Sequence, residues 1–406
     1  MAQPRQYQYA VIGGGAAGLS LIFQLIKQGA LNDQHRVLLV DPDIKEGHDH
    51  TWCFWEQGEG PFENIVHHTW SHLNLHSHSE DLSLPLNKYR YKTIFSDKFY
   101  AYLNELIANN PYIDRLVAKA DSLQADDEGV DFKVDGQAYR ASWAFSSLVN
   151  DLDLRGPKHS SQVRNRQQLV DKFNLKAPYL DQHFRGWFIE THKDTFDSDC
   201  ATLMDFRTDQ PHGETRFFYV LPFAPNRALV EMAIFSNEVW SIAQFDQAIE
   251  GYIDKYWTPS GSYSVYHQED GLIPMTTHAF PQRQGRLLYI GLRGNHGRPS
   301  TGYAFYNMQG QVTELVRRLK SDPGKLEMPK PWPKRHLLYD ATLLRILENG
   351  IMPGAKVFMD LFRQNPTDRL LAFLNGETNF GAELKLMSST RIRTFAPGFV
   401  KELLAK

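Results

Sequence analysis

The sequence predicts an α/β protein that combines a parallel sheet wound with helices, an antiparallel sheet inserted into it, and a helical C-terminal region. Three observations predict this plan. The chain opens with a strand, a glycine-rich turn and a helix; aromatic runs broken by turns follow between residues 179 and 235; and a second strand, glycine-rich turn and helix come late, at residues 287–319. The late unit indicates that the first sheet is completed there, after the insertion.

Composition narrows the class of protein. With 406 residues the chain is long enough for about two domains, and its net charge of −3 gives no basic field for a nucleic-acid partner. The two cysteines, Cys53 and Cys200, have no metal or redox spacing, which favours free thiols in a reducing compartment. We expect no signal peptide before the first strand, and with a mean hydropathy of −0.45 no run is apolar enough to cross a bilayer.

The first strand–turn–helix unit carries a G-x-G-x-x-G motif. Residues 7–12 are aromatic and β-branched, and a run with helical spacing follows the glycines and ends at Gly29. Gly13 permits the tight turn, Gly15 lets a pyrophosphate approach the backbone, and Gly18 lets the helix pack closely on the strand. The helix N-terminus offers free N–H groups to phosphates. The predicted loop consists of Gly13, Gly14, Gly15, Ala16, Ala17 and Gly18.

An acidic residue completes the nucleotide motif. Residues 36–40 form a second apolar strand, and Asp41 stands at its end, about twenty positions after the last glycine, where a ribose hydroxyl would be bound. The segment is typical of a Rossmann-like dinucleotide-binding domain. The motif alone does not separate FAD from NAD.

The segment after this unit mixes strands and one helix. Five histidines lie at residues 67–78, but the segment alternates like a strand and has no carboxylate or cysteine at ligand spacing, so we predict no metal site. Residues 96–107 read as a helix with Ser96 as its N-cap, and residues 131–139 as a hairpin with an Asp-Gly turn. Residues 151–165 are polar and turn-rich, a candidate crossing into a second domain.

The late glycine-rich turn resembles the second half of a nucleotide fold. The strand 287–291 ends at Gly291, and Ser300, Thr301 and Gly302 precede a helix predicted at 304–319, whose N-terminus would face the cofactor. This two-domain plan favours FAD over NAD. We assign residues 1–65, 88–160 and 270–325 to an FAD-binding domain, 66–87 and 161–269 to a substrate-binding sheet domain, and 326–406 to a helical C-terminal region.

Seven segments, in the same order along the chain, resemble the lycopene cyclases, FAD-dependent enzymes of carotenoid synthesis, and in particular the bacterial β-cyclases. The resemblance runs from Gly13 to Tyr303. Its segments are Thr51–Trp55, Phe184–Trp187, Leu203–Arg207, Tyr219–Phe223, Ala228–Glu231, Gly271–Thr276 and Pro299–Tyr303.

The resemblance implies a reaction without net redox change. The ψ-end of linear lycopene is protonated at its terminal double bond, the neighbouring alkene attacks the cation, and loss of a proton leaves a β-ionone ring, first in γ-carotene and then in β-carotene. Reduced FAD is needed, and NADPH or NADH would supply the reduction. Such a mechanism calls for a carboxyl group in an apolar, aromatic pocket, where burial keeps it protonated and aromatic faces stabilise the cation.

Glu231 is the carboxyl group we predict for this role, because it interrupts the apolar strand 228–235. It aligns with the first glutamate of the family's Phe-Leu-Glu-Glu-Thr motif, whereas Met232 and Ala233 replace the second glutamate and the threonine. Asp205 is a second catalytic candidate and Glu190 a weaker one. Strand alternation leaves each of these carboxylates free to face water instead.

Two other functions remain open at this point. One is a flavin-dependent monooxygenase or polyprenyl reductase on the same fold, although the Gly-Asp of such hydroxylases is missing after Gly291. The other is a flavin-bound carotenoid carrier without catalysis. Because lycopene and other linear carotenoids reside in the bilayer, we expect a cytoplasmic enzyme bound peripherally to the membrane, with the amphipathic stretch 395–404 as one candidate for the contact.

Overall fold

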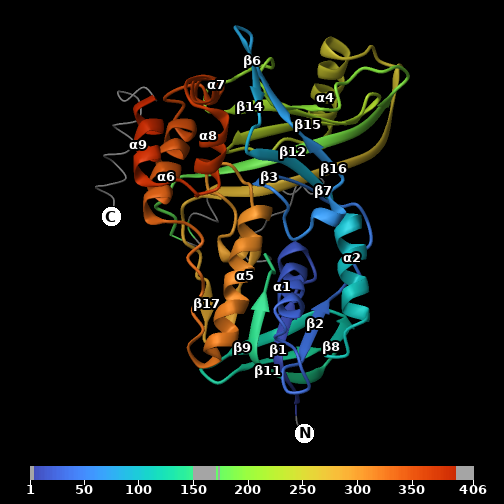
Figure 1. Ribbon diagram of the computed structural model, residues 1–406, viewed down its shortest axis with the longest axis vertical. Helices are drawn as coiled ribbons and strands as arrows, with labels where there is room; N and C mark the ends of the chain where they lie inside the picture. The colour runs from blue at the N-terminus through green and yellow to red at the C-terminus, as the bar shows by residue number, and fades with distance from the viewer. Residues whose placement is uncertain (1–3, 150–170, 172–173, 390–406) are drawn as a thin grey trace.

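The computed structural model describes residues 4–149, 171 and 174–389. The parallel sheet has the strand order β17-β18-β11-β1-β2-β8, in which β17 alone is antiparallel to its neighbour (Figure 1). Its strands are β1 (Arg5–Ile12), β2 (Val37–Asp41), β8 (Ile113–Val117), β11 (Gln137–Ser146), β17 (Arg283–Gln284) and β18 (Leu287–Tyr289). The late strand β18 does pair with the early ones, as the sequence predicts.

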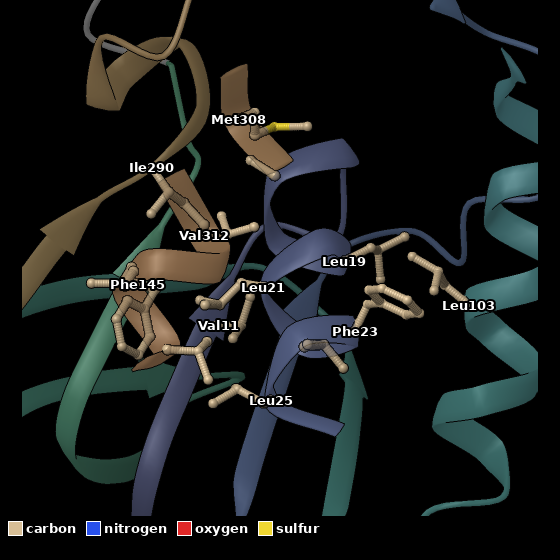
Figure 2. Close-up of a cluster of buried hydrophobic side chains, with 14 of the residues drawn as sticks. Val11, Leu19, Leu21, Phe23, Leu25, Leu103, Phe145, Ile290, Met308 and Val312 are labelled. Carbon is tan, nitrogen blue, oxygen red and sulfur yellow. The ribbon is translucent and has the colours of Figure 1, made fainter. Parts of the chain in front are cut away.

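Three helices cover one face of this sheet: α1 (Ala16–Lys27), α2 (Ser96–Ala108) and α5 (Phe305–Ser321). Their apolar side chains meet those of β1 and β11 in a single core, which Figure 2 shows around Leu21, Val11, Phe145 and Val312. On the other face, β10 (Val130–Val134) and β11 form the predicted hairpin across Asp135 and Gly136, and β9 (Ala120–Ala125) pairs with β10. Early and late segments of the chain therefore share the same hydrophobic core.

The second sheet has the order β16-β12-β15-β14-β13-β5-β6. Its strands are β5 (His72–His76), β6 (Asp81–Pro85), β12 (Tyr179–Thr191), β13 (Cys200–Asp205), β14 (Thr215–Ala224), β15 (Arg227–Ser236) and β16 (Tyr263–Thr276). All neighbours are antiparallel except β13 and β5, which run parallel; β5 comes from an early segment of the chain. A smaller sheet holds β3 (Thr51–Gln57), β7 (Tyr89–Phe95) and β4 (His68–Trp70).

Helices cover both faces of the second sheet (Figure 1). Helix α4 (Ile242–Tyr256), which starts at a capping box on Ser241, packs on one face. The C-terminal helices α6 (Lys334–Glu348), α7 (Gly354–Gln364), α8 (Thr367–Leu374) and α9 (Phe380–Ser389) pack on the other. Short 3₁₀ turns lie at η1 (Glu63–Ile65), η3 (Gly291–Gly294) and η4 (Pro323–Lys325). The stretches 151–165 and 395–404, to which we assigned a linker and a membrane contact, lie outside the described residues.

Two local predictions differ from the structure. The N-cap of α2 is Phe95 rather than Ser96, because the Ser96 hydroxyl accepts hydrogen bonds from the amides of Asp49 and His50 instead of capping its own helix. The late helix begins at Phe305 rather than at residue 304, after a turn in which Gly302 has φ +74°.

The close packing of α1 on β1 yields a stability prediction. A Cβ on Gly18 would lie 2.0 Å from the Gly13 carbonyl oxygen, so Gly18→Ala should lower the free energy of unfolding by about 1–3 kcal/mol. Gly310, within α5, has no heavy atom within 4 Å of the Cβ position, so Gly310→Ala should be neutral or stabilise by about 0.5–1 kcal/mol. Urea unfolding of both variants tests this; equal effects would contradict the packing role of Gly18.

Candidate active site and glycine-loop region

The predicted glycine loop joins β1 to α1. Gly13 has φ +105°, a conformation that favours glycine, and its amide donates to Val40 O at the end of β2. At Gly15 the position of a Cβ has no heavy atom within 4 Å. The first turn of α1, which begins at Ala16 and Ala17, has neither a side-chain cap nor an acidic residue. Its free N–H groups and positive dipole end therefore stay available to an anion.

Asp41 ends β2 beside this loop. Its Oδ2 accepts a hydrogen bond of 2.6 Å from the Gly14 amide, and Oδ1 accepts one from the Asp43 amide. The carboxylate thus ties the loop to β2. Each oxygen retains a lone pair for a further donor such as a hydroxyl group.

The two glycines predicted in the late turn, Gly291 and Gly302, lie against different parts of the protein. Gly291 (φ +66°) starts η3 next to α1, where a Cβ would lie 2.9 Å from Ala17 Cβ. In the same turn the buried His296 Nε2 has no hydrogen-bond partner among the described residues. Gly302 has positive φ, and a Cβ there would lie 2.3 Å from Gln182 Oε1 of β12. Glycine at 302 therefore lets the late turn approach the second sheet.

Ser300 and Thr301 do not begin a helix. The buried Ser300 hydroxyl donates to Asp340 Oδ1 of α6, at 2.8 Å, and Arg298 Nε donates to the same oxygen at 2.9 Å. Thr301 and Ser300 border the cavity described below. The sequence prediction missed Asp340 because it lies forty residues away on a helix with no motif; only packing brings it to this turn.

The predicted carboxylate Glu231 lies in a row across four strands of the second sheet. In register, Tyr219 of β14 pairs with Glu231 of β15, Glu231 with Gly186 of β12, and Gly186 with Glu269 of β16. Directly paired residues of antiparallel strands point to the same face. Two carboxyl groups therefore share one face, with only a glycine between them.

Burial dominates the chemistry of Glu231. The pKa of its carboxyl group is raised well above the usual value, first by desolvation and second by the charge of Glu269. Glu231 nevertheless retains some accessible surface. No cation pairs with it among the described residues, so no neighbouring charge offsets the effect of burial, which favours the protonated form.

Glu269, which sequence reasoning missed, is buried and accepts a 2.9 Å hydrogen bond from the Thr51 hydroxyl of β3. Burial raises its pKa to about 7, and the Thr51 hydrogen bond acts in the opposite direction. The only signal in the sequence was its position two residues before Gly271, at the start of a segment that carried the family resemblance. The polar run around it, residues 267–270, is typical of a surface segment. Only its register with β12 places it on the same face of the sheet as Glu231, across Gly186.

The segment before β3 is held in place from two sides. His48 Nε2 lies 3.0 Å from the Thr51 hydroxyl, and its ring stacks on Phe95 and His267, with centroids 4.4 and 4.5 Å away. Burial lowers the pKa of His48 to about 4, so its ring is neutral. Ser96 fixes the backbone through the amides of residues 49 and 50. Thr51 is therefore a fixed donor to Glu269.

Asp205 lies on the opposite face of the sheet from Glu231. It pairs in register with Phe218, which stacks on Tyr252 of α4, and the Tyr252 hydroxyl donates to Asp205 Oδ2 at 2.6 Å. Burial acts to raise the Asp205 pKa, but hydrogen bonds from Arg207 and Tyr252 outweigh it and lower the pKa. The structure thus places the two catalytic candidates Glu231 and Asp205 on opposite faces of the sheet and gives Asp205 an ion pair with Arg207. Glu190 pairs with Arg227 at the end of β12.

An apolar cavity of about 370 Å³ opens between the second sheet and helices α6–α9. Its lining is mostly aromatic and aliphatic, and Tyr219, Tyr303 and Trp55 form the end nearest the glutamates. The Tyr303 hydroxyl hydrogen-bonds with those of Tyr91 and Tyr219. Burial raises the pKa of Tyr219, and the neighbouring Tyr303 and Glu231 raise it further. Glu231 itself is not among the residues that line the cavity; it pairs in register with Tyr219, which lines it.

The other end of the cavity reaches the surface at α9. Phe380 and Leu384 line the cavity and are 66% and 59% exposed. Lys385 beside them is also exposed. Within the described residues, no helix is long and apolar enough to span a membrane.

The histidines of residues 67–78 serve separate contacts. His67 stacks on Phe95, His68 Nε2 lies 2.7 Å from Ser198 O, and His76 pairs with Asp81. In the portion of the chain that the structure describes, no three His, Cys, Asp or Glu residues gather into a metal site.

Comparison with solved structures defines the class of fold. A geranylgeranyl bacteriochlorophyll reductase-like protein from Thermoplasma acidophilum (14% identity, 99% of this chain and 100% of that one, TM-score 0.57) has a similar structure. So do a flavoprotein/dehydrogenase from Cytophaga hutchinsonii (12%, 98% and 100%, TM-score 0.62) and a flavin-dependent brominase (12%, 99% and 100%, TM-score 0.59). The chain has the two-domain flavoprotein fold.

Sequence comparison gives the family. The model of the family described as "Lycopene cyclase protein" matches residues 9–397, nearly the whole chain. The chain therefore belongs to the lycopene cyclase family. No individual curated protein matches it by sequence.

The placement of Asp205 yields a prediction. Asp205→Asn should lower the free energy of unfolding by about 1–3 kcal/mol at pH 7, because it weakens buried hydrogen bonds to Arg207 and Tyr252. Because the folded-state pKa is lowered, this difference is fully present above the ordinary aspartate value of 3.8 and fades as pH falls below it. Glu190→Gln, at an exposed ion pair, is the control and should cost less than about 1 kcal/mol. Thermal melts from pH 3 to 8 measure both; a pH-independent difference would contradict the ionised pair.

Proposed function

We propose that the protein is a lycopene β-cyclase, which converts the ψ-ends of lycopene into β-ionone rings with reduced FAD and without net redox change. The observation that carries the proposal is the position of Glu231, a buried carboxyl group without a cation partner among the described residues, which pairs in register with Tyr219 at the aromatic end of an apolar cavity. Membership of the lycopene cyclase family supports the substrate class.

The cavity suits one end of a linear polyene. Its volume lies within the range of small-molecule sites, about 300–1,000 Å³, and its lining offers no ionised group at the glutamate end. A hydrocarbon without polar groups is bound by burial alone. Tyr219, Tyr303 and Trp55 at that end present aromatic faces, which stabilise a carbocation as they do an ammonium ion.

Glu231 acts as the general acid in this proposal. It transfers its proton to the terminal double bond of the ψ-end, the neighbouring double bond attacks the cation and closes the ring, and loss of a proton restores neutrality. The product is an isomer of the substrate, so the protein's own carboxyl groups suffice to balance the protons. A general acid of raised pKa contributes about 10²–10⁴-fold to such a step.

The glycine loop fits FAD. The pyrophosphate would be held by the loop of Gly13, Gly15 and Gly18 and by the uncapped first turn of α1, and the open space at Gly15 permits its approach. Asp41 would bind the ribose. The unpartnered His296 Nε2 near Gly291 offers a further contact. Bound in its reduced form, FAD supplies an electron-rich ring that stabilises positive charge on the substrate, with NADPH or NADH as the source of electrons.

Expression in cells that accumulate lycopene, with chromatography of the pigments, tests the function. Wild type should yield β-carotene or γ-carotene, and Glu231→Gln should lower the yield about 10²-fold or more because the amide cannot protonate an alkene. If lycopene remains unconverted in the wild-type cells, the proposed cyclase activity is contradicted. Hydroxylated or hydrogenated pigment, with stoichiometric NADPH consumption in vitro, would establish the redox alternative instead.

We further propose that the cavity mouth contacts a membrane, in which linear carotenoids reside. Phe380 and Leu384 are exposed at the mouth, and Lys385 offers a cation to anionic lipid. Changing both apolar residues to Ser should reduce co-sedimentation with anionic vesicles several-fold. The same change at Val265 and Tyr266, exposed residues that do not line the cavity, is the control and should leave it unchanged. Equal binding of both double variants would rule out this contact.

A further inference from the structure

The row Tyr219–Glu231–Gly186–Glu269 holds two carboxyl groups, of which the reaction above uses one. We infer that Glu269 is the general base of the cyclisation, paired across Gly186 with Glu231 as the general acid. This inference rests on the proposed function and names a catalytic residue for it.

The geometry allows the two carboxyl groups to act on one ring. Two strand spacings of about 4.8 Å each separate β15 from β16. The intervening Gly186 presents no side chain, and the position that a Cβ would take there lies 2.7 Å from Leu229 Cδ1 and 3.3 Å from Glu231 Oε2. A larger residue at 186 would collide with Leu229 and crowd Glu231. Glycine at this position therefore lets the Leu229 and Glu231 side chains lie over β12.

Their surroundings assign the roles. Glu231 receives no hydrogen bond from a side chain among the described residues and lies next to Tyr219, which favours the neutral acid. Glu269 accepts a hydrogen bond from the Thr51 hydroxyl, and this bond stabilises the carboxylate form. Like charges side by side also disfavour two anions, so one proton is shared by the pair. Distinct environments of this kind separate an acid from a base.

Thr51 is itself fixed as a donor toward Glu269. It has one hydroxyl proton, which points to Glu269 Oε2, so His48 Nε2, 3.0 Å away, must carry its hydrogen and donate to the Thr51 oxygen. His48 is held neutral by burial, and stacking on Phe95 and His267 fixes its ring. His48 and Thr51 are thus positioning residues for the base.

The protons balance over one turnover. Glu231 gives its proton to the terminal alkene carbon, a C–H bond forms, and the new C–C bond closes the ring. Glu269 takes the proton from the ring carbon as the double bond of the β-ionone ring forms. The proton then passes from Glu269 to Glu231, and the pair returns to its starting state without an external donor.

The titratable groups around Glu269 come from three elements. They are Glu231 of β15, Cys53 of β3, and Asp49 and His50 of the segment before β3. His50 lies against Asp49, at 3.0 Å. His50 lowers the pKa of Glu269 and Asp49 raises it, so a substitution of either residue would change the charge beside the carboxylate. The Thr51 hydroxyl is the contact that can be changed without altering charge.

The test uses the full chain with FAD and NADPH, and lycopene in vesicles, with rates measured from pH 5 to 9. Glu269→Gln should lower kcat about 10²–10⁴-fold with little change in KM. Thr51→Val should raise the Glu269 pKa and move the acidic limb of the kcat profile to higher pH. Thr51→Ser, which keeps the hydroxyl, should retain the wild-type profile. Flavin content and thermal melting show whether each variant is folded.

The outcomes separate the two proposals. Inactive wild-type enzyme would defeat the proposed function and this inference together. Active wild type with a Glu269→Gln variant of unchanged kcat and pH profile would overturn the role of Glu269 alone. If Glu269→Gln does not fold, the Thr51 pair decides: an acidic limb that Thr51→Val does not move overturns the inference.

Discussion

Desolvation of the Glu231 carboxyl group is the constraint on which the proposed site depends. A buried carboxylate without a cation is costly, so burial favours the neutral form, which carries the proton that a general acid needs. Helices α6–α9 keep that face of the second sheet away from water, and Tyr219 and Tyr303 close the cavity beneath them. The acidity of the site is thus a property of the packing around β15 rather than of the glutamate alone.

Strand alternation explains why a second acid comes from elsewhere. Residues 231 and 232 point to opposite faces, and Met232 packs with the α4 side, so a glutamate there would not face the cavity. Glu269, two strands away, lies on the same face of the sheet as Glu231. The same alternation places Asp205 against Tyr252 and Arg207, whose hydrogen bonds keep it ionised despite its burial.

Contacts distant in sequence join the two sheets of the molecule. Asp340 of α6 binds Ser300 and Arg298 of the late turn, and Gly302 lets that turn approach Gln182 of β12. Thr51 of β3 reaches Glu269 in the same way. These contacts fix the late glycine-rich turn relative to the cavity beside the second sheet, at the boundary that a flavin and a polyene would have to share.

The sequence by itself determined the fold class, the glycine loop with Asp41, the hairpin at Asp135 and the candidate Glu231, because each rests on local spacing, turn chemistry or one charge in an apolar strand. Its resemblance to a family was also correct. Only the tertiary structure decided which carboxyl groups share a face of the sheet. Glu269, Gly186 and Asp340 carry no local signal, since their roles arise from strand register and helix packing, and these depend on contacts between residues far apart in the chain.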